Sequence, residues 1–223
     1  MEKNSSTPDG AFAIAEEFDK SERFEEAIRR YTEVKNKFPY SNFAIRSELA
    51  IADVYYKQES YAEAQVAYQA FRELHPKYEK ADYVQYRIGL SFFNQLPSTI
   101  DRDLTLANDT ILNLSDLIKK YPNSEYIKDA TEKRTAAIKM QAEKEEYIAD
   151  FYFKREIYDS ALGRYEGLYK NFKALGFDAK ALARAAYCAE KIGDSAKFEK
   201  YSKILSTDFP DSSEYKDLKK ETK

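Results

Sequence analysis

Few residues of this chain could do covalent or metal chemistry. His75 is the only histidine and Cys188 the only cysteine among 223 residues, and together they cannot supply the ligands of most zinc sites. A Ser-His-Asp triad would have to use His75, and no nucleophile-elbow sequence is present. Gly163 and Gly167 lie four residues apart but lack the Lys-Ser or Lys-Thr pair of a phosphate-binding loop. The sequence therefore predicts a protein that is not an enzyme and holds no metal or cofactor.

The composition favours non-covalent recognition through aromatic side chains. The chain has 19 tyrosines and 14 phenylalanines but no tryptophan, and such rings pack between helices or line binding surfaces. Its 36 basic and 39 acidic residues leave a formal charge of −3, whereas a nucleic-acid binder carries a strongly basic face. We expect most rings to pack at helix contacts and a minority to line a peptide groove.

The elements that must position these rings are helix pairs with a period of 37 residues. A large–small–x–x–aromatic pattern places its small residue at positions 15, 52, 89, 149 and 186, so only the third interval, of 60, departs from the period. In the second helices an Ala-x-x-x-Tyr pattern begins at Ala27, Ala64 and Ala161. Both patterns are typical of tetratricopeptide (TPR) repeats, which stack into a solenoid with a concave surface. The predicted fold class is all-α, a TPR-like superhelical solenoid of about five helix-turn-helix repeats.

The repeat register also explains the two residues that invite a catalytic interpretation. His75 precedes a helix-ending proline, at a position that is aromatic in other repeats, as at Phe38, Tyr121 and Phe209. Packing is therefore the better explanation of His75. Cys188 lies inside an expected helix and is interpreted as a small buried apolar residue rather than a reactive thiol.

Departures from the period predict the domain organisation. Residues 1–10 are polar and lack the apolar region of a signal peptide, which is typical of a disordered leader or a trimmed linker. Residues 11–122 would hold repeats 1–3, with an insertion at 95–103. Residues 123–210 would hold repeats 4–5, preceded by a long helix over 124–155, because that stretch has no proline or glycine. Residues 211–223 form a charged tail that frays or caps the last helix.

Exposed positions on the first helix of each pair form the concave surface, and the register allows them to be counted. In repeats 1–3 they combine cations with aromatic rings, which suits an extended peptide carrying aromatic side chains and a carboxylate. The alternative is that these rings are buried between helices. In repeat four the same face is acidic and is the expected partner-docking surface. The predicted groove residues are Phe12, Arg46, Tyr56, Lys57, Tyr83, Tyr86 and Phe93, and the predicted docking residues are Glu143, Glu146 and Asp150.

A series of motifs extends over most of the chain, from about Ala11 to Pro210. In order, they are Tyr55-Tyr56-Lys57, Asp82-Tyr83-Val84-x-Tyr86, Asp101-Arg102-Asp103 and Tyr121-Pro122-Asn123-Ser124-x-Tyr126. With the insertion and the long helix, this order resembles the BamD family. These are the TPR lipoproteins of the bacterial outer-membrane β-barrel assembly machine (BAM complex).

The resemblance implies a non-catalytic scaffold and substrate receptor on the periplasmic face of the outer membrane, acting in the assembly and insertion of β-barrel proteins. Residues 11–122 would be the substrate-facing half, which binds C-terminal targeting signals of unfolded outer-membrane proteins. Residues 123–210 would dock on the periplasmic domains of the barrel-forming insertase, and other assembly-machine lipoproteins would be further partners. No cofactor and no nucleic acid are implied.

Two points remain open at this stage. The family is anchored to the membrane through an acylated N-terminal cysteine, which this sequence lacks. Either Met1 replaces that cysteine in a trimmed form or the protein is not lipidated. The alternative function is a general TPR adaptor in periplasmic cell-envelope maintenance or division. The insertion at 95–103 and the long helix favour the assembly role, because a generic adaptor needs neither.

Overall fold

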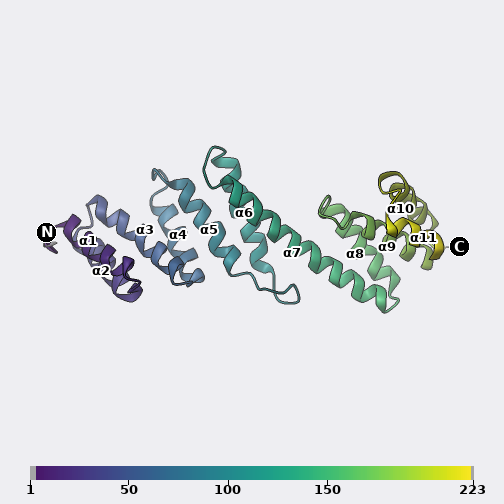
Figure 1. The fold of residues 1–223 in the computed structure, drawn as a ribbon, viewed down its shortest axis with the longest axis horizontal. Coiled ribbons are helices and arrows are strands. Elements are labelled where there is room, and N and C mark those ends of the chain that lie inside the picture. Colours follow the sequence, from purple (N-terminus) through teal and green to yellow (C-terminus); the bar gives the residue numbers. More distant parts are fainter. Residues whose placement is uncertain (1–3, 222–223) are drawn as a thin grey trace. The chain divides into compact units, whose positions relative to one another are not determined.

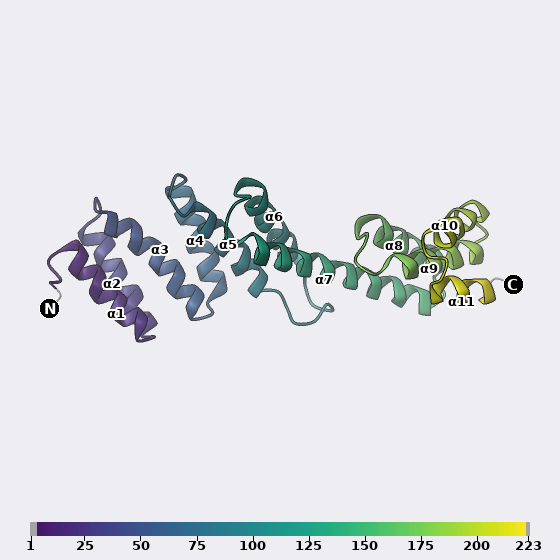
Figure 2. The same ribbon diagram turned by 45° about the horizontal axis from the view of Figure 1, so that its top comes forward.

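The computed structural model describes residues 4–221, and within this range the secondary structure is entirely helical. Figures 1 and 2 show the helices from two directions. No helix in the described range is long and apolar enough to cross a membrane. The helices are α1 (Pro8–Lys20), α2 (Phe24–Lys37), α3 (Asn42–Lys57), α4 (Tyr61–Leu74), α5 (Ala81–Asn94), α6 (Thr105–Lys120), α7 (Ile127–Lys154), α8 (Tyr158–Asn171), α9 (Asp178–Lys191), α10 (Ser195–Asp208) and α11 (Ser213–Glu221).

The turn between the two helices of a pair has the same backbone conformation in four places. The angle φ is positive at Glu22, Glu59 and Glu156, with values of 56°, 63° and 61°, and at Gly193, with 79°. This left-handed conformation costs a non-glycine residue about 1–2 kcal/mol, yet it recurs at the same point of the repeat. The recurrence agrees with the sequence prediction that these helix pairs are copies of one unit.

The chain divides into two compact units, and each is described by itself. Unit 1 comprises the residues up to Leu96 and residues 105–135, and unit 2 comprises residues 97–104 and those from Ala136 onward. The long helix α7 therefore contributes its first turns to unit 1 and the rest to unit 2. The division between the units falls inside this helix, and the loop at 97–104 belongs with unit 2.

In unit 1 each helix from α1 to α6 packs against the next. Small and aromatic side chains alternate at these helix contacts. For example, Ala64 and Tyr68 of α4 are fully buried and pack with residues of α3 and α5. Gly89 of α5 lies so close to α6 that a Cβ atom there would be 2.3 Å from the Leu114 Cδ2 atom. The small residue of the repeat pattern is therefore what allows two helices to approach this closely.

In unit 2 the second part of α7 packs with α8 to α11 around one apolar cluster. Tyr165, Leu168 and Leu182 are fully buried there. Cys188 is buried in the same cluster, and burial raises the pKa of its thiol to about 12. The loop at 97–104 reaches α7, where the Lys144 ammonium donates to the Arg102 carbonyl oxygen at 2.6 Å.

The ends of the described chain differ from the sequence prediction. Helix α1 begins at Pro8, and Gly10 is buried, so the last three residues of the expected leader are helical; Met1–Lys3 lie outside the described residues. The expected charged tail also forms a helix, α11, with Leu218 buried at 4 % exposure. Its last two residues, 222–223, lie outside the described range.

Candidate peptide-binding groove

The strongest cluster of recognition groups in unit 1 lies on α3 and α5. It consists of Asp53 and Tyr56 from α3 with Tyr83 and Arg87 from α5, and we call it the Arg87 cluster. The members lie one helical turn or less apart on each helix, so each helix presents them on one face. Three of the four are half-buried tyrosine or arginine side chains, which combine an apolar body with a polar tip.

A chain of hydrogen bonds connects the Arg87 cluster to the core. Arg87 Nε donates to the Tyr83 hydroxyl at 3.0 Å, and this hydroxyl donates to Asp53 Oδ1 at 2.6 Å. Asp53 Oδ1 also accepts from the hydroxyl of the fully buried Tyr68, at 2.6 Å. Burial raises the pKa of Asp53, an effect that the two tyrosine donors oppose. The carboxylate therefore fixes two rings at once and has a fixed position itself.

The Arg87 guanidinium lies close to two aromatic rings. Its central carbon lies 4.4 Å from the Tyr56 ring centroid and 5.1 Å from that of Tyr83. Tyr56 is held in turn by Asn94, whose amide donates to the Tyr56 hydroxyl at 2.8 Å. None of the ion pairs found within residues 4–221 involves Arg87, and its terminal nitrogens make no hydrogen bond there. Because a guanidinium fork matches a carboxylate, Arg87 is a preorganised site for one.

A second aromatic group in unit 1 surrounds Tyr86. The Tyr86 hydroxyl donates to Asp129 Oδ2 at 2.6 Å, and its ring stacks on that of Tyr126 with centroids 4.6 Å apart. Phe93 lies under the Lys133 ammonium, at 5.2 Å from its ring centroid. Both predicted groove residues therefore face the start of α7 and contribute to packing there as well as to the surface.

Three further predicted groove residues are engaged within α1 and α3. Phe12 is only 5 % exposed and packs on Tyr31, so it is a core residue and not a groove residue. Arg46 is exposed, with its guanidinium 4.4 Å from the Phe12 ring centroid. Lys57 is exposed but pairs with Asp19 at 2.6 Å. None of these three contacts includes a member of the Arg87 cluster. The prediction that Phe12 is an exposed groove residue is corrected, because its ring is buried.

The predicted docking residues on α7 are occupied within unit 2. Glu143 pairs loosely with Lys139 at 3.8 Å, and Glu146 binds the Lys180 ammonium at 2.9 Å. Asp150 accepts from the Tyr165 hydroxyl at 2.6 Å and from Lys180 at 2.8 Å. Glu146 and Asp150 therefore help to hold α7 to α8 and α9, and they are not a free acidic face.

Arg87 is not among the residues predicted from the sequence. A detectable signal was present, because Arg87 follows Tyr83 by one helical turn and so shares its face. His75 behaves as the repeat register predicts: its ring packs 4.7 Å from that of Phe71, and its Nε2 atom lies 2.6 Å from Glu48 Oε2.

Comparisons with known proteins agree with this architecture. Residues 4–205 match the family model YfiO, described as "Outer membrane lipoprotein". The outer membrane protein assembly factor BamD of Neisseria meningitidis serogroup A is 28% identical over 210 residues, covering 90% of this chain and 79% of that protein. The BamD of Vibrio cholerae is 25% identical over 188 residues, covering 80% and 78%.

Among solved structures, the TPR2AB-domain:pHSP90-complex of yeast Sti1 aligns over 95% of this chain and 81% of that chain. Its TM-score is 0.51 with 16% sequence identity. A likeness at this identity concerns the fold alone, and it confirms the TPR-like arrangement of the helices. The chain belongs to the YfiO family of outer membrane lipoproteins and, as a member of that family, is not an enzyme.

Proposed function

We propose that this protein is a scaffold and substrate receptor in the assembly of β-barrel outer-membrane proteins, acting at the periplasmic face of the outer membrane. The relatives named above are assembly factors for outer membrane proteins, and a TPR-like fold offers the extended surfaces that such a role needs. Its partners would be the periplasmic domains of the barrel-forming insertase, other lipoproteins of the assembly machine and unfolded client chains.

The client site that we propose is the Arg87 cluster of unit 1, and the ligand is a C-terminal segment rich in aromatic residues. The observation that carries the proposal is the Arg87 guanidinium, which lies over the Tyr56 and Tyr83 rings and forms no ion pair within residues 4–221. A chain terminus would supply that carboxylate, and its last aromatic side chain would pack beside the two tyrosines. Residues 11–122, which hold the Arg87 cluster, would thus be the substrate-facing half, as the resemblance to the BamD family implies.

The direct test uses two synthetic peptides that differ in one group. Both end in phenylalanine, one with a free carboxylate and the other with a C-terminal amide, and binding is measured by fluorescence anisotropy. We expect the acid to bind at least tenfold more tightly than the amide, which is about 1.4 kcal/mol. Arg87→Ala should remove this preference, because the variant lacks the guanidinium that binds the carboxylate of the acid. Its affinity for the acid should then equal its affinity for the amide.

Arg46→Ala is the matched control, since Arg46 is also a cation on an aromatic pair in unit 1 but lies over Phe12 and Phe43. This variant should keep the preference for the acid. Equal binding of the acid and the amide by the unmodified protein would overturn the assignment of Arg87. Loss of the preference in Arg46→Ala alone would move the site to α1 and α3.

Docking to the insertase is tested separately, by calorimetric titration of this chain with the insertase periplasmic domains from the same organism. We expect micromolar or tighter binding. If the folded chain shows no binding, the assembly role loses its support and a general envelope adaptor becomes the better interpretation. Peptide binding and insertase binding can fail independently, so the two results separate the receptor role from the scaffold role.

A further inference from the structure

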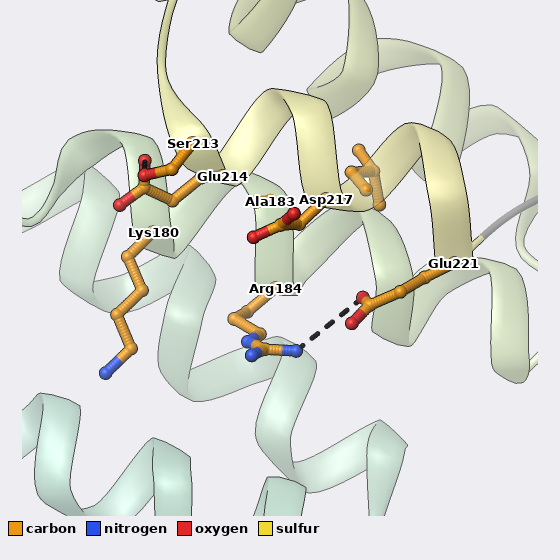
Figure 3. A pocket seen from close by; sticks show the side chains of 8 residues that line it. Lys180, Ala183, Arg184, Ser213, Glu214, Asp217 and Glu221 are labelled. Atoms are coloured by element: carbon orange, nitrogen blue, oxygen red, sulfur yellow. Dashed lines mark hydrogen bonds and ion pairs between the residues drawn. The ribbon is translucent and has the colours of Figure 1, made fainter.

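A pocket of about 220 Å³ lies between α9 and α11 in unit 2. Figure 3 shows that α9 contributes the cations Lys180 and Arg184, while α11 contributes the carboxylates of Glu214, Asp217 and Glu221. Lys180 is already bound by two carboxylates of α7. Arg184 is therefore the α9 cation that remains for a ligand on this side.

Arg184 in unit 2 has the same setting as Arg87 in unit 1. Its guanidinium carbon lies 4.3 Å from the Phe153 ring centroid, as that of Arg87 lies 4.4 Å from Tyr56. The difference is that Arg184 has a carboxylate within reach, because Glu221 Oε2 of α11 lies 3.8 Å from Arg184 Nη1 (Figure 3). Helix α11 thus supplies to unit 2 the kind of group that the Arg87 cluster lacks.

The attachment of α11 to α9 is limited. Leu218 is the one buried residue of this nine-residue helix. Tyr215 of α11 is half-buried and packs against the apolar cluster of unit 2. The ion pair of Lys220 with Asp217 at 3.0 Å and the Lys219 ammonium over the Tyr215 ring at 4.1 Å are internal to the helix. The link to Arg184 is long for an ion pair, and both its side chains are more than a third exposed. A helix of nine residues is marginal in isolation, so α11 depends on these few contacts for its place on α9.

We propose that the α9 surface around Arg184 is a second binding site and that α11 is its built-in, displaceable occupant. The external ligand is an acidic amphipathic helix of a partner protein, with an apolar side chain in the place of Leu218 and a carboxylate one turn later, in the place of Glu221. The occupant seen in the structure defines this chemistry, because α11 presents these two groups to α9.

Because α11 is part of the same chain, it occupies the Arg184 site in the unmodified protein and an external helix binds there only weakly. A short connection holds α11 at an effective concentration in the millimolar range, so a free peptide at micromolar concentration competes poorly. The apparent affinity for an external helix is reduced by the fraction of molecules in which α11 has left. Weakening the Leu218 contact should therefore open the site without changing α9.

The test uses the full chain and a labelled peptide of residues 211–221, which is the occupant that the structure shows. Leu218→Asp should bind this peptide at least tenfold more tightly than the unmodified chain. Lys219→Asp, a change on the exposed side of the same helix, is the matched control and should bind as the unmodified chain does. Adding Arg184→Ala to Leu218→Asp should abolish the gain. Circular dichroism checks that each variant is folded.

Three outcomes would overturn the proposal. The first is no gain of binding in a folded Leu218→Asp variant, and the second is a gain that survives Arg184→Ala. The third is self-association of Leu218→Asp in light scattering without peptide binding, which would make a second copy of the chain the occupant. Hydrogen exchange gives an independent measurement: α11 amides should exchange at least tenfold faster than those of α10, and equal protection would show that α11 is an integral part of unit 2.

Discussion

Asp53 in unit 1 and Asp150 in unit 2 occupy the same place in their repeats, yet their surroundings differ in charge. Each accepts a 2.6 Å hydrogen bond from a tyrosine 15 positions later, Tyr68 or Tyr165. Each also accepts from a residue 30 positions later, which is Tyr83 in unit 1 but Lys180 in unit 2. One aspartate is thus held by two neutral donors and the other by a neutral donor and a cation.

The arginines one turn further on extend this comparison. Arg87 and Arg184 each lie over an aromatic ring of the preceding first helix. Arg184 has Glu221 beside it, whereas Arg87 has no ion-pair partner in the described part of the chain. The repeat therefore positions an arginine on a ring in both units, and the neighbouring residues decide whether its terminal nitrogens are open to a ligand. Four predictions test the contacts that distinguish the two units, in order of decreasing effect.

The largest effect concerns the glycines of the two units. Gly89→Ala should lower the free energy of unfolding by about 1–3 kcal/mol, because the added Cβ meets the buried Leu114 side chain. Gly163→Ala in α8 is the matched control, since nothing lies within 4 Å of its Cβ position. It should instead stabilise the helix by up to about 1 kcal/mol. Urea denaturation measures both, and a neutral Gly89→Ala would show that α5 and α6 can separate at little cost.

The second prediction separates the two aspartates. Asp150→Asn should destabilise the protein by about 1–2 kcal/mol, because Lys180 loses a charged partner. The partial exposure of both side chains keeps this loss of stability small. Asp53→Asn should cost less than about 0.5 kcal/mol at pH 7, since an amide oxygen can still accept from the two tyrosine hydroxyls. Thermal unfolding of the two variants gives the comparison. If both variants lose the same stability, the charge of the neighbouring donor does not distinguish Asp53 from Asp150.

The third prediction concerns pH and Asp53. Because burial raises the pKa of Asp53 above that of the unfolded chain, the folded state holds this proton more tightly. The resulting stability is fully present below the ordinary aspartate pKa of about 3.9 and is lost as pH rises through the folded pKa. The slope is at most about 1.4 kcal/mol per pH unit. Asp53→Asn should remove this component from urea unfolding measured between pH 3 and pH 7, and an unchanged profile would contradict it.

The smallest effect is expected at Lys57. Its ion pair with Asp19 joins α3 to α1 at 2.6 Å, but the Lys57 side chain is 49% exposed. Lys57→Ala should therefore change the free energy of unfolding by less than about 0.5 kcal/mol. It should also leave peptide binding unchanged if the Arg87 cluster is the receptor site. A tenfold loss of peptide affinity in this variant would instead support the groove counted from the sequence.

The features that could be predicted best from the sequence are those that recur with the repeat. The small positions, the Ala-x-x-x-Tyr pattern and the long helix are periodic or compositional features, and the structure has them where the register places them. The predictions for single side chains were the least reliable. Phe12 and Tyr56 each lie close to an arginine guanidinium, yet Phe12 is buried and Tyr56 is half-buried, because their neighbours on adjacent helices differ.

Local periodicity alone determined that this protein is an all-helical stack of repeats, and the order of its motifs indicated its family. Only the tertiary structure decided which cations are available for a ligand. The repeat register does not distinguish four cations on the first helices, which are Arg46, Lys57, Arg87 and Arg184. Whether each cation is available for a ligand depends on the carboxylates and rings that other helices place beside it. Helix α11 is the clearest case, because its sequence predicts a charged tail that frays or caps the last helix, while its packing places Leu218 and Glu221 on α9.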